Sequence, residues 1–155
     1  MNAVELLKQD HEVVRQLLEK LTSTTERAVK TRSELLQRLD FELKVHTQIE
    51  EQIFYPAFKQ AGGKEEAVMS AEAVEEHRTV DARALPDLLK TAPDTTDFSG
   101  RAKVLKELLE HHIEEEEQEM FPSATELLGE DKLAELGQQM EELKRSLKQT
   151  LGQAA

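Results

Sequence analysis

The strongest constraint on the fold is a segment that occurs twice. The first copy, HTQIEEQIFYP, covers residues 46–56, and the second, HIEEEEQEMFP, covers residues 112–122, which lie 66 positions further along. The same offset of 66 relates His11 to His77. Two histidine matches and a proline match at one offset are hard to attribute to a glutamate-rich composition. We therefore predict that residues 1–125 are built from two similar helix pairs.

Apolar residues recur with the period of an α-helix along most of the chain, and no alternating strand pattern persists. Segment 91–100 is expected to be a loop, and Pro86 is expected to kink the helix that contains it. The predicted helices cover about 2–22, from after Thr25 to Gln60, 64–91, 100–121 (interrupted at Pro122) and 129–153. The fold class is therefore all-α: one domain over residues 1–155, an antiparallel up-down four-helix bundle with an extra C-terminal helix.

Composition excludes several kinds of site and partner. The chain has no cysteine, so any metal must be held by nitrogen and oxygen atoms. A net charge of −12 repels nucleic acid and anionic lipid. The first residues lack the features of a signal peptide, and no apolar run reaches membrane-spanning length. We expect a cytoplasmic protein with no nucleic-acid or membrane partner, and the sequence identifies no protein partner.

Four histidines and two glutamates lie on helix faces that should be buried. Histidine and glutamate are four residues apart in both copies of the repeated segment, so each pair shares one face of its helix. Burying an unpaired carboxylate is strongly unfavourable, and a bound cation compensates for it. The candidate metal ligands are His11, His46, Glu50, His77, His112 and Glu116.

Six ligands suffice for two metal ions with bridging carboxylates and open positions. The donor types fit iron, manganese, zinc or copper, and the helical-bundle setting favours iron. Two interpretations without metal stay open. The histidine–glutamate pairs could form a buried hydrogen-bond network, or the chain could be a purely structural bundle.

The combined motif resembles the hemerythrin-like family, also called the HHE cation-binding domain. The matching residues are His11, His46-x-x-x-Glu50 with Glu51 and Phe54-Tyr55-Pro56, His77, and His112-x-x-x-Glu116 with Glu117 and Phe121-Pro122. The resemblance implies a four-helix bundle around a non-haem di-iron centre, with two iron ions joined by an oxo or hydroxo bridge. It also implies that the four histidines are terminal ligands and that Glu50 and Glu116 bridge.

The chain departs from the oxygen-carrying hemerythrins in two places. Those proteins have a second histidine where this chain has Ala73, so we expect one ion to have an extra open position. They also space the last histidine and carboxylate by five residues, which leaves His111 with Glu116, or His112 with Glu117, as alternative pairs. The internal repeat favours His112 with Glu116.

Four further residues near the candidate ligands in the sequence are expected to lie outside the ligand set. His111 should lie on a polar helix face, and Glu51 and Glu117 should be surface residues or supports for the ligands. Tyr55 is nine residues after His46, which places it on the opposite side of an ideal helix, in a packing role, although the adjacent Pro56 could turn it toward the ligands.

The resemblance implies a protein that binds or reacts with dioxygen, nitric oxide or peroxide. The missing histidine argues against stable oxygen carriage and favours reaction, such as the consumption of peroxide or nitric oxide. The alternative function is an iron- or oxygen-sensing or iron-handling module without catalytic turnover. No catalytic acid or base outside the ligand set is predicted.

Overall fold

The computed structural model describes the backbone of residues 1–154 and the side chains up to residue 152. Within these residues it is helical and contains no strand. The α-helices are α1 Ala3–Thr22, α2 Val29–Ile49, α3 Tyr55–Ala61, α4 Lys64–Thr79, α5 Leu85–Leu89, α6 Thr96–Glu115 and α7 Phe121–Ala154. The π-helical turns η1 Glu50–Phe54, η2 Val80–Ala84 and η3 Glu116–Met120 connect α2 to α3, α4 to α5 and α6 to α7.

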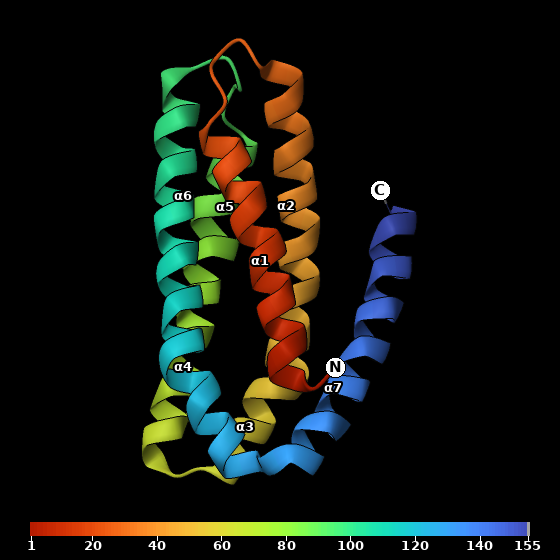
Figure 1. Ribbon diagram of the computed structural model, residues 1–155. Coiled ribbons are helices and arrows are strands. Elements are labelled where there is room, and N and C mark those ends of the chain that lie inside the picture. The colour runs from red at the N-terminus through yellow and green to blue at the C-terminus, as the bar shows by residue number, and fades with distance from the viewer. Residues whose placement is uncertain (155) are drawn as a thin grey trace.

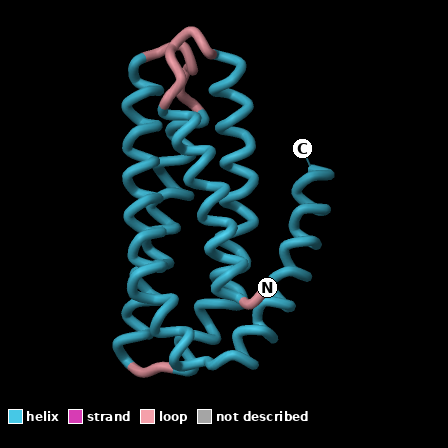
Figure 2. Tube along the Cα trace, viewed as in Figure 1, coloured by secondary structure: helices cyan, strands magenta, loops and turns pink. Residues whose placement is uncertain are grey.

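The helices form four antiparallel rods: α1, α2 with α3, α4 with α5, and α6 with the start of α7 (Figure 1). Short connections at residues 23–28, 62–63 and 90–95 join them at alternating ends (Figure 2). This arrangement confirms the predicted all-α up-down bundle. At Gly129 the backbone leaves helical geometry, with φ 79° and ψ 170°. The rest of α7 then runs back along the outside of the bundle against α1 and α2.

The helix that leads into the second copy of the repeat starts earlier than predicted. Segment 91–100 was expected to be a loop because of its small polar residues, but α6 begins at Thr96. The hydroxyl of Thr95 accepts a hydrogen bond from the backbone N–H of Phe98, which is a standard helix N-cap. Phe98 is 1 % exposed and anchors this first turn in the core. The prediction of a loop up to residue 100 was therefore wrong.

Each π-helical turn ends two residues before a proline. The residue before each proline donates its N–H to the carbonyl five residues earlier, joining Tyr55 to Glu50, Leu85 to Val80 and Phe121 to Glu116. A proline ring collides with the carbonyl four residues before it, and a widened turn relieves that collision. The helix therefore continues through Pro122, where an interruption was expected, and breaks at Gly129.

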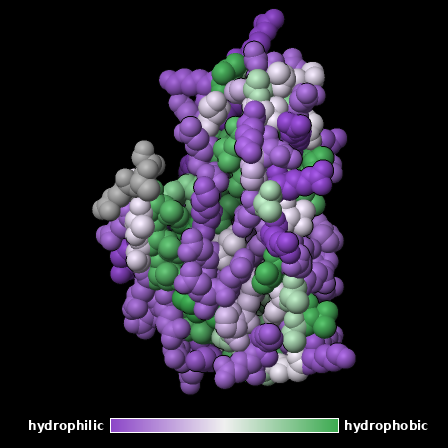
Figure 3. Space-filling model, turned by 180° about the vertical axis from the view of Figure 1, so that it is seen from behind, coloured by the Kyte–Doolittle hydropathy of each residue, from purple (hydrophilic) through white to green (hydrophobic). Residues whose placement is uncertain are grey.

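The apolar core consists of two clusters with polar residues between them. One cluster contains Phe54, Phe58 and Phe121 and extends to the buried face of α7. The other lies toward the opposite end and contains Leu18, Leu39 and other residues. The face of the molecule seen in Figure 3 is mostly hydrophilic, with smaller hydrophobic areas. Among the described helices, none has an apolar stretch that is long enough to cross a lipid bilayer.

Candidate metal centre

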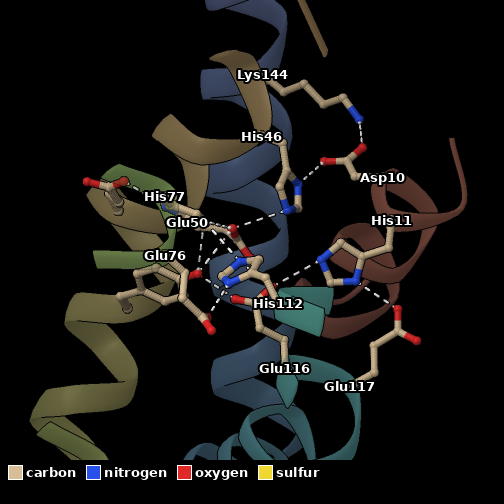
Figure 4. A network of polar contacts seen from close by, with 12 residues as sticks. Asp10, His11, His46, Glu50, Glu76, His77, His112, Glu116, Glu117 and Lys144 are labelled. Atoms are coloured by element: carbon tan, nitrogen blue, oxygen red, sulfur yellow. Dashed lines mark hydrogen bonds and ion pairs between the residues drawn. The ribbon is translucent and has the colours of Figure 1, made fainter. Parts of the chain in front are cut away.

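The six side chains predicted to be metal ligands meet in the interior of the bundle (Figure 4). None of them is more than 6 % exposed. They come from all four rods, and the two carboxylates are the first residues of η1 and η3. The inward contacts are His11 Nε2–Glu116 Oε1 3.1 Å, His112 Nε2–Glu116 Oε1 3.3 Å, His46 Nε2–Glu50 Oε1 3.1 Å and His77 Nε2–Glu50 Oε1 3.0 Å.

The ligand atoms form two overlapping groups. Within each group, one ligand atom per residue lies within 4.8 Å of all the others. The His11/His46 group also includes Glu50 and Glu116, and the His77/His112 group also includes Glu50. Glu116 reaches the second group as well, through its contact with His112. Each carboxylate thus contacts one histidine of each group.

A carboxylate outside the centre holds each histidine from behind. The Nδ1 contacts are His11–Glu117 2.7 Å, His77–Glu51 2.7 Å, His46–Asp10 3.0 Å and His112–Glu76 2.7 Å. A carboxylate at Nδ1 favours the tautomer that carries its hydrogen there and leaves the Nε2 lone pair directed inward. This is the arrangement that a metal-binding histidine requires.

The outer carboxylates follow the internal repeat. The offset of 66 residues relates Asp10 to Glu76 and Glu51 to Glu117. Glu51 and Glu117 therefore support the ligand histidines, one of the two roles predicted for them. Asp10 and Glu76 were not predicted, although the offset of 66 could have identified them as a pair.

Several inward atoms are buried without a hydrogen-bond partner. Within the described residues these atoms are His11 Nε2, His46 Nε2, Glu50 Oε2 and Glu116 Oε1. The nitrogens lie near carboxylate oxygens, but the pairs are not aligned as hydrogen bonds. Buried polar atoms are nearly always hydrogen-bonded. Four buried nitrogen and oxygen atoms without such a partner, all close to one point, therefore need an explanation. Cations coordinated by nitrogen and carboxylate oxygen provide it, so this donor set fits a metal site.

The electrostatics of the centre also favour positive charge. Burial alone would lower the pKa of His46, but Glu50 and Asp10 outweigh burial and raise that pKa to about 10. Burial would raise the pKa of Glu50, yet His46 and His77 hold it well below its ordinary value. The pKa of His112 is raised despite burial, chiefly by Glu116. Without a metal, protons supply the positive charge that the carboxylates attract.

Comparison with known proteins agrees with this chemistry. A family model described as the Hemerythrin HHE cation binding domain matches residues 2–124. This chain belongs to the hemerythrin HHE cation-binding family. Uncharacterized proteins of Mycobacterium bovis and Mycobacterium tuberculosis are each 31 % identical to it over 141 residues, which is 90 % of this chain and 83 % of each relative.

A solved structure extends the likeness beyond the sequence match. The crystal structure of a hemerythrin HHE cation binding domain-containing protein from Mycobacterium kansasii has a TM-score of 0.83 and 31 % identity. The match covers 97 % of this chain and 89 % of that one, so it includes most of α7. The likeness to this structure therefore includes the added helix as well as the bundle.

Among the residues outside the predicted ligand set, Tyr55 differs most from expectation. Its hydroxyl lies 2.5 Å from Glu116 Oε2, 3.2 Å from Glu50 Oε1 and 3.3 Å from His77 Nε2. The prediction that Tyr55 faces away from the centre was wrong. It assumed an ideal helix, whereas the extra residue in η1 rotates Tyr55 by roughly 100° toward the ligands. Burial, Glu116 and Glu50 raise its pKa, so in the metal-free protein the hydroxyl stays protonated.

His111 lies on the polar face, as predicted. Its side chain is 65 % exposed, and its Nε2 lies 3.1 Å from Glu115 and 3.7 Å from Glu76. Its neighbour His112 is the one directed into the centre, at 3.3 Å from Glu116. The helix-face prediction that separated the two histidines is confirmed.

Two small cavities border the centre. One, of about 20 Å³, lies against the histidines and has room for one water-sized molecule. Its aliphatic wall consists of Val14, Leu43, Val80, Leu109 and Ile113. The other, also about 20 Å³, is lined by Ala73 and Glu116 among others. Space is therefore present beside Ala73, where oxygen carriers have a further histidine.

Proposed function

We propose that this protein holds a non-haem di-iron centre and uses it to bind or react with dioxygen, nitric oxide or peroxide. The observation that carries the proposal is the set of four buried donor atoms without hydrogen-bond partners, which surround one point between two bridging carboxylates. In this proposal, His11 and His46 hold one ion and His77 and His112 hold the other. Glu50 and Glu116, which each contact a histidine of both groups, would bind both ions.

Tyr55 would add an oxygen ligand to these four histidines and two glutamates. Its hydroxyl lies among the atoms of the His77/His112 group, 3.3 Å from His77 Nε2. This group also adjoins Ala73, where the cavity leaves room beside Glu116. We therefore propose Tyr55 as an oxygen ligand of this ion in place of the absent histidine.

The residues around the centre support reaction with a small molecule. When bound, a di-iron pair supplies a redox-active metal with an open coordination position. The aliphatic side chains over the histidines exclude bulk water and leave space for a small molecule. The outer carboxylates keep the histidines oriented while charge at the centre changes. The cytoplasmic location remains a prediction from the sequence.

The test is to purify the protein without added metal and to measure its iron content. Near-ultraviolet spectra are then recorded with dioxygen and with peroxide, and peroxide consumption is assayed. The proposal predicts about two irons per chain, a spectrum that changes with the oxidant, and consumption of peroxide. Iron that binds tightly and raises the melting temperature without any turnover would favour the iron- or oxygen-sensing alternative. Protein that binds no iron would contradict both functions.

A further inference from the structure

The C-terminal helix contributes a charged side chain to the surroundings of the centre. Lys144 Nζ donates a hydrogen bond to Asp10 Oδ1 (Figure 4). The other oxygen of the same carboxylate lies 3.0 Å from His46 Nδ1. The side chain of Asp10 is 7 % exposed and that of Lys144 is 22 % exposed. One carboxylate thus links a lysine of α7 to a predicted metal ligand.

Packing holds Lys144 in this place. The part of α7 after Gly129 buries Leu133, Leu136 and Met140 in the same apolar cluster that contains Phe121. Gly137 lies so close to the backbone of Met1 and Asn2 that a Cβ atom at this position would collide with it. Lys144 is therefore presented by a docked helix, which lowers the entropy lost when the ion pair forms.

The other half of the centre has a different partner at the equivalent place. There the outer carboxylate is Glu76, which lies 2.7 Å from His112 Nδ1. Its second oxygen lies 3.7 Å from the exposed His111. The carboxylate that contacts His46 is thus paired with a lysine. The carboxylate that contacts His112 has only a longer contact with an exposed imidazole.

We propose that Lys144 is a positioning residue for the metal ligand His46. The charged hydrogen bond fixes the orientation of Asp10, and Asp10 in turn holds the Nδ1 side of His46 so that Nε2 points at the ion. The extra helix of this bundle therefore tightens one of the two metal positions. This inference rests on the proposed function.

The experiment titrates metal-free protein with ferrous iron, without oxygen, in competition with a chelator. Replacing a residue that supports a metal ligand typically lowers metal affinity 10–100-fold. Lys144 acts one contact further out, through Asp10. Lys144→Met should therefore lower the affinity for one of the two ions, the one that His46 holds, by roughly tenfold or less. The other ion should bind as in the wild type. Lys144→Arg should restore most of the affinity. Lys148→Met, at an exposed lysine one turn further along α7, is the matched control and should have no effect.

A second series tests whether Lys144 acts through Asp10. In an Asp10→Asn background, Lys144→Met should cause no further loss of affinity. The inference is overturned if Lys144→Met titrates like the wild type, or if it weakens both ions equally and lowers the melting temperature of the metal-free protein in both backgrounds. Wild-type protein that binds fewer than two ions would overturn the proposed function and this inference with it.

Discussion

The two halves of the candidate metal centre have the same kinds of candidate ligand and differ in the residues around them. Each half has two histidines, and each histidine has a carboxylate at Nδ1. In the His11/His46 group, Arg15 pairs with the outer carboxylate Glu117 at 3.0 Å, and Lys144 pairs with Asp10. In the His77/His112 group, the equivalent outer carboxylates are Glu51 and Glu76. Among the described residues, neither of them pairs with an arginine or a lysine.

The internal repeat also aligns the residues that close each half. Phe121 stacks on His11 with ring centroids 5.6 Å apart, and the equivalent Tyr55 stacks on His77 at the same distance. Leu7 is fully buried, whereas Ala73, the residue aligned with it, borders a cavity. The repeat thus relates the candidate ligands of the two groups, and its departure at Ala73 leaves space beside the His77/His112 group. We expect Tyr55 and the space beside Ala73 to make the ion of the His77/His112 group differ from the other ion.

The largest effect should come from a ligand that both halves share. Glu50 contacts a histidine of each group, so Glu50→Ala should reduce bound metal to near zero. Metal analysis of the purified variant provides the measurement. His111→Ala removes an exposed imidazole one residue from His112 and should leave the metal content unchanged. A Glu50→Ala protein with the full metal content would mean that the two groups do not share this carboxylate.

The next largest effect should come from substitutions that lower the metal affinity of one half at a time. Glu117→Gln and Glu51→Gln each remove a charged partner from one histidine Nδ1. Each should weaken one ion by about 10–100-fold and spare the other, as outer partners of metal ligands do elsewhere. Competition titration with a chelator measures both. If only one of the two substitutions mattered, the two halves would not be equivalent in their outer carboxylates.

A pH dependence should distinguish the metal-free protein from the loaded one. The pKa of His46 is raised from 6.5 to about 10, so its charge stabilises the metal-free fold at low pH, and this contribution is lost as the pH rises through about 10. A metal must displace that proton, so metal affinity should rise with pH. The difference in melting temperature between the loaded and metal-free protein should widen from about pH 6 to about pH 9. A difference that narrows would contradict the assigned protonation.

The smallest effect should come from making the halves more alike. Tyr55→Phe removes the hydroxyl that donates to Glu116, and leaving a buried acceptor unsatisfied costs about 1–3 kcal/mol of stability in the metal-free protein. If the hydroxyl also ligates iron, the variant should lose visible absorption that the wild type shows in the ferric state. Phe121→Tyr is the control, because it adds a hydroxyl at the position that the repeat aligns with Tyr55. Identical iron spectra for Tyr55→Phe and the wild type would exclude ligation by Tyr55.

Much of this centre could be predicted because it depends on local geometry. His46 and Glu50 share a face on any regular α-helix, and the offset of 66 carried that relation to His112 and Glu116. Tyr55 was misplaced because the widened turn before Pro56 breaks the regular angle between residues, although the proline was a visible signal.

The contact of Lys144 could not be predicted in the same way. It depends on where α7 docks after the break at Gly129, and a helical pattern does not specify which surface a following helix covers. The early start of α6 was missed for a different reason. Thr95 is an ordinary helix cap, but the small polar residues after it are also typical of loops.

The most direct test of the central claim is the stoichiometry of metal binding. Metal-free wild-type protein is titrated with ferrous iron in the absence of oxygen, next to the Glu50→Ala variant. The account predicts that the wild type saturates at about two ions per chain and that the variant binds almost none. Saturation at a single ion, or equal iron binding by both proteins, would contradict a centre in which four histidines and two shared carboxylates hold a pair of ions.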